Sequence, residues 1–144
     1  MPEVKRSALL TYSAHSLYDI VNDVSAYPEF LPWCGGVEIH RQDSASMEAT
    51  IKMKMGKLDH RFKTRNTMIP NESISMSLLE GPFSKLEGEW RFSDIENLGS
   101  KIEFELSFEV ASPITSAIIT PAFTHIANTM VDSFCSRARQ LHGG

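Results

Sequence analysis

Side chains that could perform chemistry are few in this sequence, and their spacing defines no site. The five histidines lie far apart along the chain, at His15, His40, His60, His125 and His142. None of them has a second histidine or a cysteine four residues away, which is the spacing that places two metal ligands on one face of a helix, and we expect no carboxylate at that spacing to complete a metal site. The sequence therefore predicts no metal site.

Nucleophilic and acid–base chemistry also lacks a defined pairing. Cys34 and His60 would form a nucleophile and its base only if the fold brought them together, and a buried structural thiol is the commoner role. Asp19, Asp23 and Glu29 fit a solvated helix face and a local turn contact better than an acid–base pair. The sequence therefore favours a protein that is not an enzyme.

Composition and charge limit the class of protein. The 144 residues are 42% hydrophobic and 22% charged, which is typical of one globular domain, here residues 1–144. The net charge of -4 argues against a chain that is basic throughout, and we expect no DNA partner, but a local basic patch is compatible with it. The pair Gly35-Gly36 lacks the Gly-Lys-Ser/Thr sequence of a phosphate-binding loop.

Cysteine usage and hydropathy bear on the compartment. Cys34 and Cys135 lie far apart with no disulfide-framework spacing, which suits a reducing environment. The N-terminal sequence shows no secretory signal or transit peptide, and no apolar segment approaches the roughly 20 residues that span a bilayer. We expect a cytoplasmic protein, with a peripheral location at the inner membrane as the alternative.

The stretch from Ser112 to Leu141 predicts a long amphipathic helix. Its apolar residues recur at helical spacing, with polar residues on the opposite side. The apolar positions are Ile119, Phe123, Ala127, Met130, Val131, Phe134, Ala138 and Leu141. Pro121 removes a backbone donor, so we expect a kink there or a second helix start capped by Thr120.

Most of the chain upstream of this helix alternates with period two, which predicts strands. We expect a first strand over 4–13, a short helix over 14–24 capped by Ser13, and one helical turn within 27–34 that Gly35-Gly36 ends. Six more strands with short connections then form an antiparallel meander. They run from Val37 onward and over 47–55, 58–69, 74–78, 86–92 and 102–110. The predicted fold class is α+β, with a seven-stranded sheet wrapped around the terminal helix.

Two segments carry a resemblance to a known family. Residues 18–34 (YDIVNDVSAYPEFLPWC) and 81–92 (GPFSKLEGEWRF) resemble the coenzyme Q-binding proteins of the START-like, helix-grip superfamily. The bacterial members of that group are described as ribosome association toxins. The resemblance covers essentially the whole chain and implies a curved sheet that grips the terminal helix, with an apolar tunnel between them. It does not fix the function, because helix-grip folds host carriers, cyclases, receptors and binding modules. The resemblance therefore leaves a cyclase-type activity as the minor alternative.

The tunnel that the resemblance implies would hold a polyprenyl quinone such as ubiquinone, with no other cofactor required. The apolar positions expected to face it include several methionines, whose soft side chains can line an adaptable site. These positions are Met53, Met55, Phe62, Met76, Leu78, Phe83, Trp90, Phe104, Leu106, Phe123 and Met130. The alternative for each one is an ordinary core residue. In the ligand-binding interpretation, the break at Pro121 is the candidate gate.

The charged residues at the outward positions of the meander separate into a basic group and an acidic group. Basic side chains gather on the strands 47–55 and 58–69 and at their turn, whereas glutamates occupy the later strands. The basic positions are Lys52, Lys54, Lys57, Arg61, Lys63 and Arg65. This patch is compatible with ribosomal RNA phosphates, with anionic lipid head groups, or with a solvated surface that serves solubility alone. It carries no aromatic residue of the kind that stacks on single-stranded bases.

Two functions follow, and one protein can perform both. The main hypothesis is that the protein binds a quinone-like lipid in the tunnel and supports respiratory electron transport. The alternative is that it binds the large ribosomal subunit through the basic patch and blocks the joining of the subunits.

Overall fold

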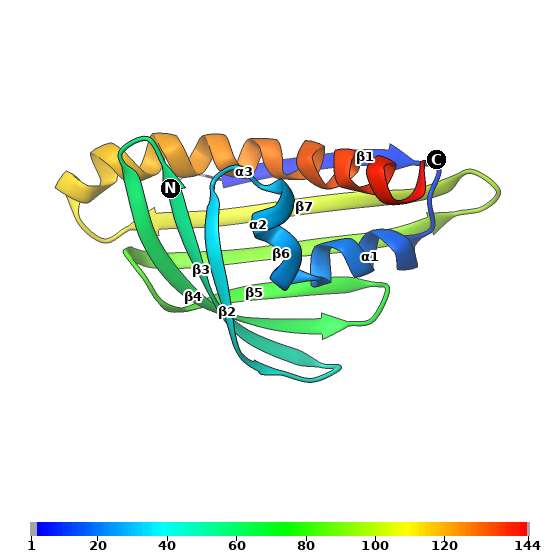
Figure 1. Cartoon of the computed structure of the whole chain (residues 1–144), viewed down its shortest axis with the longest axis horizontal. Helices are drawn as coiled ribbons and strands as arrows, with labels where there is room; N and C mark the ends of the chain where they lie inside the picture. The colour runs from blue at the N-terminus through cyan, green and yellow to red at the C-terminus, as the bar shows by residue number, and fades with distance from the viewer. Residues whose placement is uncertain (1–2, 144) are drawn as a thin grey trace.

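Seven antiparallel strands form one sheet in the order β1-β7-β6-β5-β4-β3-β2 (Figure 1). The computed structural model describes residues 3–143. The strands are β1 (Glu3–Leu10), β2 (Cys34–Gln42), β3 (Ser46–Met55), β4 (Leu58–Ile69), β5 (Ser73–Glu80), β6 (Phe83–Ile95) and β7 (Gly99–Val110). The helices are α1 (Ala14–Asn22), the short 3-10 helix η1 (Val24–Ala26), α2 (Tyr27–Phe30) and α3 (Pro113–His142). The predicted element order and α+β class are confirmed.

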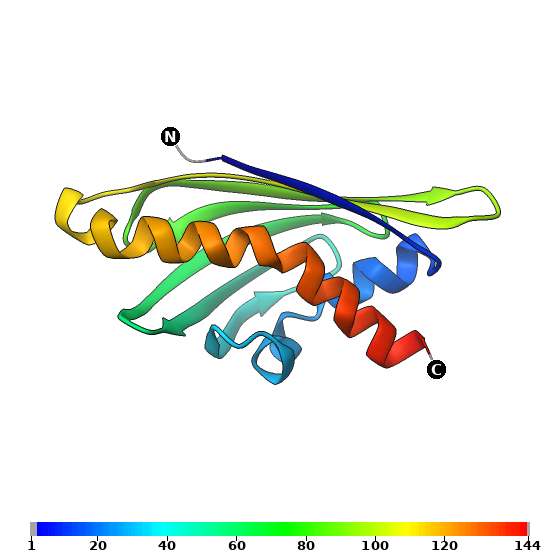
Figure 2. The ribbon, with the colours of Figure 1, turned by 90° about the horizontal axis from the view of Figure 1, so that it is seen from above.

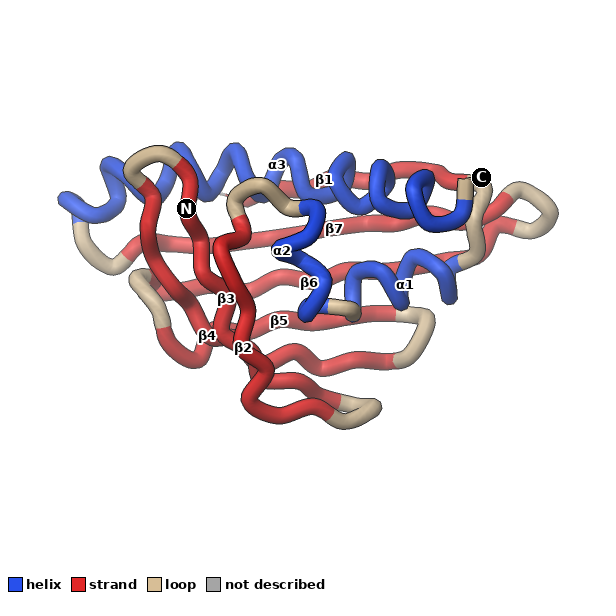
Figure 3. Tube along the Cα trace, in the orientation of Figure 1, coloured by secondary structure: helices blue, strands red, loops and turns tan. Residues whose placement is uncertain are grey.

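The helices cover one face of the sheet and leave the other to solvent. The long helix α3 packs against β1, β7 and α1, and α1 also contacts β6 and β7. Seen from above, α3 runs along the side of the sheet on which α1 and α2 also lie (Figure 2). The trace coloured by secondary structure shows the short helices in front of the long strands of the sheet (Figure 3). Within residues 3–143, no helix is both long and apolar enough to cross a membrane.

The first strand ends earlier than expected. β1 stops at Leu10 and not at residue 13, because the chain turns there to start α1. The Ser13 hydroxyl accepts a hydrogen bond from the Ser16 N–H at 3.1 Å, which confirms Ser13 as the cap. The Ser100 hydroxyl donates to the Tyr12 carbonyl at 2.7 Å and fixes this turn against β7.

The glycine pair 35–36 lies inside a strand, contrary to the expectation that it ends the helical turn before it. β2 begins at Cys34, and its register against β3 shifts between Cys34 and Gly36. Such a bulge inserts an extra residue, and a glycine accommodates it at low cost. The side chain of Lys52 passes over Gly35, where a Cβ would lie 3.6 Å from its Cδ.

Helix α3 is continuous through Pro121. The helix start expected at Thr120 does not occur. Thr124 donates its hydroxyl hydrogen bond to the Thr120 carbonyl at 2.7 Å, and the hydroxyls of Ser116 and Thr120 lie 2.7 Å apart. Figure 2 shows one unbroken helix that bends in its second half. The role of Pro121 as a gate stays a prediction.

The core between sheet and helix is rich in aromatic rings. Trp90 and Phe104 stack with their ring centroids 4.2 Å apart, and Phe134 of α3 meets Trp90 edge-on at 5.2 Å. The segment between α1 and β2 adds to this core, since Tyr27, Leu31 and Trp33 are all buried. Ring pairs of this geometry add to the free energy of apolar burial, so the part of α3 around Phe134 is firmly anchored.

Candidate functional site

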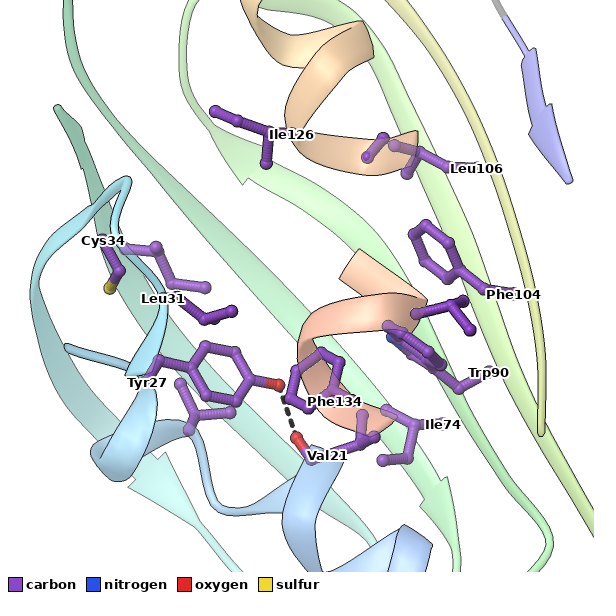
Figure 4. Close-up of a cluster of buried hydrophobic side chains, with 14 of the residues drawn as sticks. Val21, Tyr27, Leu31, Cys34, Ile74, Trp90, Phe104, Leu106, Ile126 and Phe134 are labelled. Carbon is purple, nitrogen blue, oxygen red and sulfur yellow. Dashed lines mark hydrogen bonds between the residues drawn. The ribbon is translucent and has the colours of Figure 1, made fainter. Parts of the chain in front are cut away.

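A small apolar cavity of about 50 Å³ lies between the sheet and α3. It is lined by residues from the region before β2, from β3 to β7 and from α3. Figure 4 shows part of its surroundings, with Trp90, Phe104 and Leu106 on the strands of the sheet and Ile126 on α3. The cavity is the feature of the interior that resembles a ligand site.

Seven of the eleven apolar residues expected at a ligand line this cavity. They are Phe62, Met76, Trp90, Phe104, Leu106, Phe123 and Met130. The other four lie elsewhere in the interior or at its margin: Met53 is fully buried beside Cys34 in the β2–β3 ladder, and Met55 and Leu78 are half-buried. Phe83 closes the end of the core, because its ring packs on Phe123 with the centroids 5.0 Å apart.

The cavity is smaller than a tunnel for a polyprenyl quinone. Pockets for small molecules typically measure about 300 to 1,000 Å³, and one water occupies about 30 Å³ of liquid. The terminal helix therefore packs mostly as core in this conformation. A larger ligand requires the wall to move, and Met76 and Met130 are the flexible side chains on it.

Sequence reasoning missed the polar part of the cavity wall. Thr64 and Asn66 are 3% and 7% exposed and line the cavity together with Trp33 and Tyr27. Both β4 residues continue the inward parity of Phe62, so period two alone predicts that their side chains lie on the inner face of the sheet. Because both side chains are polar, a prediction based on apolar positions does not include them.

The structure does not bring Cys34 and His60 together. Met53 on β3 lies between them, paired with Cys34 on one side and with His60 on the other. Burial raises the pKa of the Cys34 thiol above its ordinary value, and the thiol donates to the Gly36 carbonyl with Sγ and O 3.7 Å apart. A protonated thiol with this partner is a structural group and not an activated nucleophile.

Metal and acid–base groups are equally sparse. No group of three or more His, Cys, Asp or Glu side chains within residues 3–143 could hold a metal ion. His15 and Asp19 do form an i, i+4 pair on α1, with Nε2 and Oδ2 3.2 Å apart, but both side chains are exposed. The pair therefore belongs to the helix surface.

The basic patch lies on the outer face of the β3–β4 hairpin. Lys52 stands directly opposite Arg61 in the ladder, and Lys63 stands opposite Thr50 two register pairs further along. Arg61 is exposed, and the other two side chains are half-exposed. None of the three makes an ion pair with a described residue, although Lys63 also stands opposite Glu80 of β5. These three cations define what we call the free basic cluster.

Two of the other predicted patch members face carboxylates. Nη2 of Arg65 lies 3.2 Å from Oε2 of Glu48, and Lys54 stands opposite Asp59 in the same ladder. Lys57 is exposed at the turn between the strands. The patch is therefore narrower than the sequence predicted, because strand register placed acids beside its ends.

The other half of the outer face is acidic, as expected. The sheet order places the serine-faced strand β5 between the basic strand β4 and the glutamate-bearing strand β6. Arg91 sits within the acidic half, and its guanidinium pairs with Glu89 at 3.2 Å and with Glu105 at 2.9 Å. The outer face is thus divided into a basic part on β3 and β4 and an acidic part on β6 and β7.

A curved antiparallel sheet that grips one long helix over a small cavity defines the helix-grip class, and comparison with known proteins assigns the family. Residues 10–135 match the family model described as polyketide cyclase/dehydrase and lipid transport. The chain belongs to this family. A START superfamily protein from Mycobacterium smegmatis has the same fold, with a TM-score of 0.76 over 96% of this chain and 98% of that chain at 20% identity.

Two curated relatives carry functional names. The chain is 46% identical over 140 residues to a protein of Pseudomonas aeruginosa named ribosome association toxin RatA, and the match covers 97% of each. It is 27% identical over 143 residues to the mitochondrial coenzyme Q-binding protein COQ10 of Drosophila melanogaster, covering 96% of this chain and 59% of that protein. The relative named for ribosome association is thus similar over its full length, and the one named for coenzyme Q is more distant.

Proposed function

We propose that this protein is a non-enzymatic, cytoplasmic protein that binds the large ribosomal subunit through the free basic cluster and hinders subunit joining. The observation that carries the proposal is the register pair Lys52 and Arg61, which have no carboxylate opposite them in the β3–β4 ladder, with Lys63 nearby on β4. The full-length similarity to a ribosome association toxin supports it.

The chemistry of the outer face favours docking on a folded RNA backbone. The outward residues of β3 and β4 include no aromatic side chain, so bases are not stacked there. Cations held on two rigid strands instead match phosphates at fixed spacing. A domain docked at the surface where the other subunit joins would block joining by occupying it.

Co-sedimentation with purified ribosomal subunits tests this function. The protein should sediment with the large subunit and not with the small one. Its affinity should fall as salt rises, with a slope of about -2 to -3 in log K against log salt for three phosphate contacts. Sedimentation with neither subunit at low salt would overturn the proposal.

A second function is the binding of a hydrophobic molecule in the cavity, and the lining residues favour it. The wall is mostly apolar and carries two methionines that can move aside. A quinone such as ubiquinone is the ligand that the relative named for coenzyme Q binding suggests, with a role in respiratory electron transport. Mass spectrometry of the natively purified protein tests it: an isoprenoid quinone should be extracted, and repeated extracts free of lipid would count against it.

A further inference from the structure

The wall of the cavity has a polar part that an ordinary core would not require. Trp33, Thr64 and Asn66 line it and are 4%, 3% and 7% exposed. Trp33 precedes β2, whereas the other two lie on β4, so separate segments of the chain contribute polar groups to one cavity.

The indole N–H of Trp33 is a buried donor without a partner. Among the described residues, only two fully buried polar side-chain atoms make no hydrogen bond, and they are Trp33 Nε1 and Asn22 Oδ1. Asn22 does not line the cavity. Native proteins pair such groups with other residues, water or ligand, because an unpaired buried donor destabilises the folded state. The Trp33 N–H is therefore a donor that is free to bond an acceptor atom.

The neighbouring polar groups narrow the chemistry of that acceptor. The Tyr27 hydroxyl donates to the Val21 carbonyl and is already used, as the dashed line in Figure 4 shows. The Thr64 hydroxyl donates to Oδ1 of Asn66 at 3.1 Å, which engages the oxygen of that amide. The amide then offers its NH₂ group, so Trp33 and Asn66 both present donors. A complementary ligand atom is an acceptor.

The residues that line the cavity also indicate the charge of the ligand. No Asp, Glu, Lys, Arg or His lines the cavity, so an ionised ligand would be buried without a counter-charge. We propose that the cavity takes a neutral, largely apolar molecule whose carbonyl oxygen accepts a hydrogen bond from Trp33 Nε1, with the Asn66 amide as a second donor. This inference rests on the proposed ligand-binding function and assigns its polar subsite.

A matched pair of compounds tests the assignment. Duroquinone is a fully methylated quinone, so it has no free ring position for addition of a thiol. Durene has the same methylated ring without the oxygens. In isotope-labelled protein, duroquinone should shift the indole N–H resonance of Trp33 saturably, and durene should leave it in place. Duroquinone should also bind about tenfold more tightly than durene, the difference expected for one hydrogen bond to an otherwise unpaired donor.

Variants identify the donors. Trp33→Phe assigns the indole resonance and should abolish the preference for duroquinone, and Asn66→Leu should reduce it. Met47→Leu changes a buried methionine outside the cavity wall and should retain the preference. If the Trp33 variant does not fold, the resonance of the other indole, assigned through Trp90→Phe, identifies that of Trp33 in the wild-type protein.

Each outcome is decisive. If both compounds bind, durene at least as tightly, and the Trp33 resonance does not move, the donor assignment is wrong while the ligand-binding function stands. If neither compound binds, both are wrong. A preference for duroquinone that survives Trp33→Phe would remove Trp33 from the subsite.

Discussion

Lys52 and Arg61 stand directly opposite each other on β3 and β4, and no carboxylate of a described residue pairs with either. Other basic residues of the same two strands do have a carboxylate opposite them. Arg65 stands opposite Glu48, and Lys54 stands opposite Asp59. Like charges across a ladder are destabilising. The unneutralised pair is therefore destabilising to the fold, and the docking on ribosomal RNA proposed above would offset that cost.

Replacing one member of this pair should stabilise the protein. Lys52→Glu converts a repulsive cross-strand pair into an attractive one and should raise the free energy of unfolding by roughly 0.2 to 1 kcal/mol. Urea denaturation measures the change. Lys5→Glu is the matched control, because Lys5 stands opposite Glu105 and the same substitution creates a repulsive pair. If both variants shift stability in the same direction, local pairing does not govern this face.

The turn between β6 and β7 depends on a glycine. Gly99 has φ +118, and a Cβ there would lie 2.0 Å from the Leu10 carbonyl oxygen. Gly99→Ala should therefore lower the free energy of unfolding by more than about 2 kcal/mol. Gly36→Ala, where a Cβ meets nothing within 4 Å, should change it by less than about 0.5 kcal/mol. Equal thermal stability of the two variants would show that the β1 end does not pack on this turn.

The volume of the cavity that is available to a ligand should depend on Gly88. A Cβ at this residue would lie 2.6 Å from Cε of Met76, which lines the cavity, and 3.1 Å from Cδ1 of Leu106. Gly88→Ala should push the methionine into the cavity and weaken duroquinone binding several-fold. Adding Met76→Ala should restore binding, because the displaced group is then absent. Titration calorimetry on the single and double variants checks this, and failure of the second change to restore affinity would contradict it.

Stability should fall in alkaline solution. Burial raises the pKa of both Cys34 and Cys135 above the ordinary value of 9.0, and burial likewise raises the pKa of Tyr27 above 10.0. The folded state then holds protons that the unfolded chain releases, so the stabilisation is complete below about pH 9 and is lost as pH rises toward the folded-state values. Denaturation at pH 8 and pH 10 should show the loss, and Cys34→Ala should reduce its size. A flat profile above pH 9 would refute the burial of these groups.

Most of the fold was predictable because each element carries a local signal. β3 and β7 alternate apolar and polar residues without interruption, and Ser13 caps α1 by a contact three residues away. The errors arose where tertiary contacts override local signals. Gly36 is of a residue type that usually ends an element, but it lies in a bulged strand. Helix α3 continues through Pro121, where neighbouring hydroxyls and packing support it.

The sites were predicted less completely, for two physical reasons. Whether a cation is neutralised depends on strand register, which places Glu48 beside Arg65 and leaves Lys52 facing Arg61. Which inward residues border a void depends on how side chains fill the core, so Met53 packs solidly while Met76 lines the cavity. Neither property follows from period two alone.

The central claim is tested most directly by reversing the free basic cluster and measuring co-sedimentation with the large ribosomal subunit. Lys52→Glu combined with Arg61→Glu should abolish binding while the protein stays folded. Lys5→Glu combined with Lys101→Glu makes the same change in net charge on β1 and β7, outside the cluster, and should leave binding within about twofold. Loss of binding in the first variant alone is the predicted result. Binding that is unchanged in the first variant, or lost equally in both, would contradict the account.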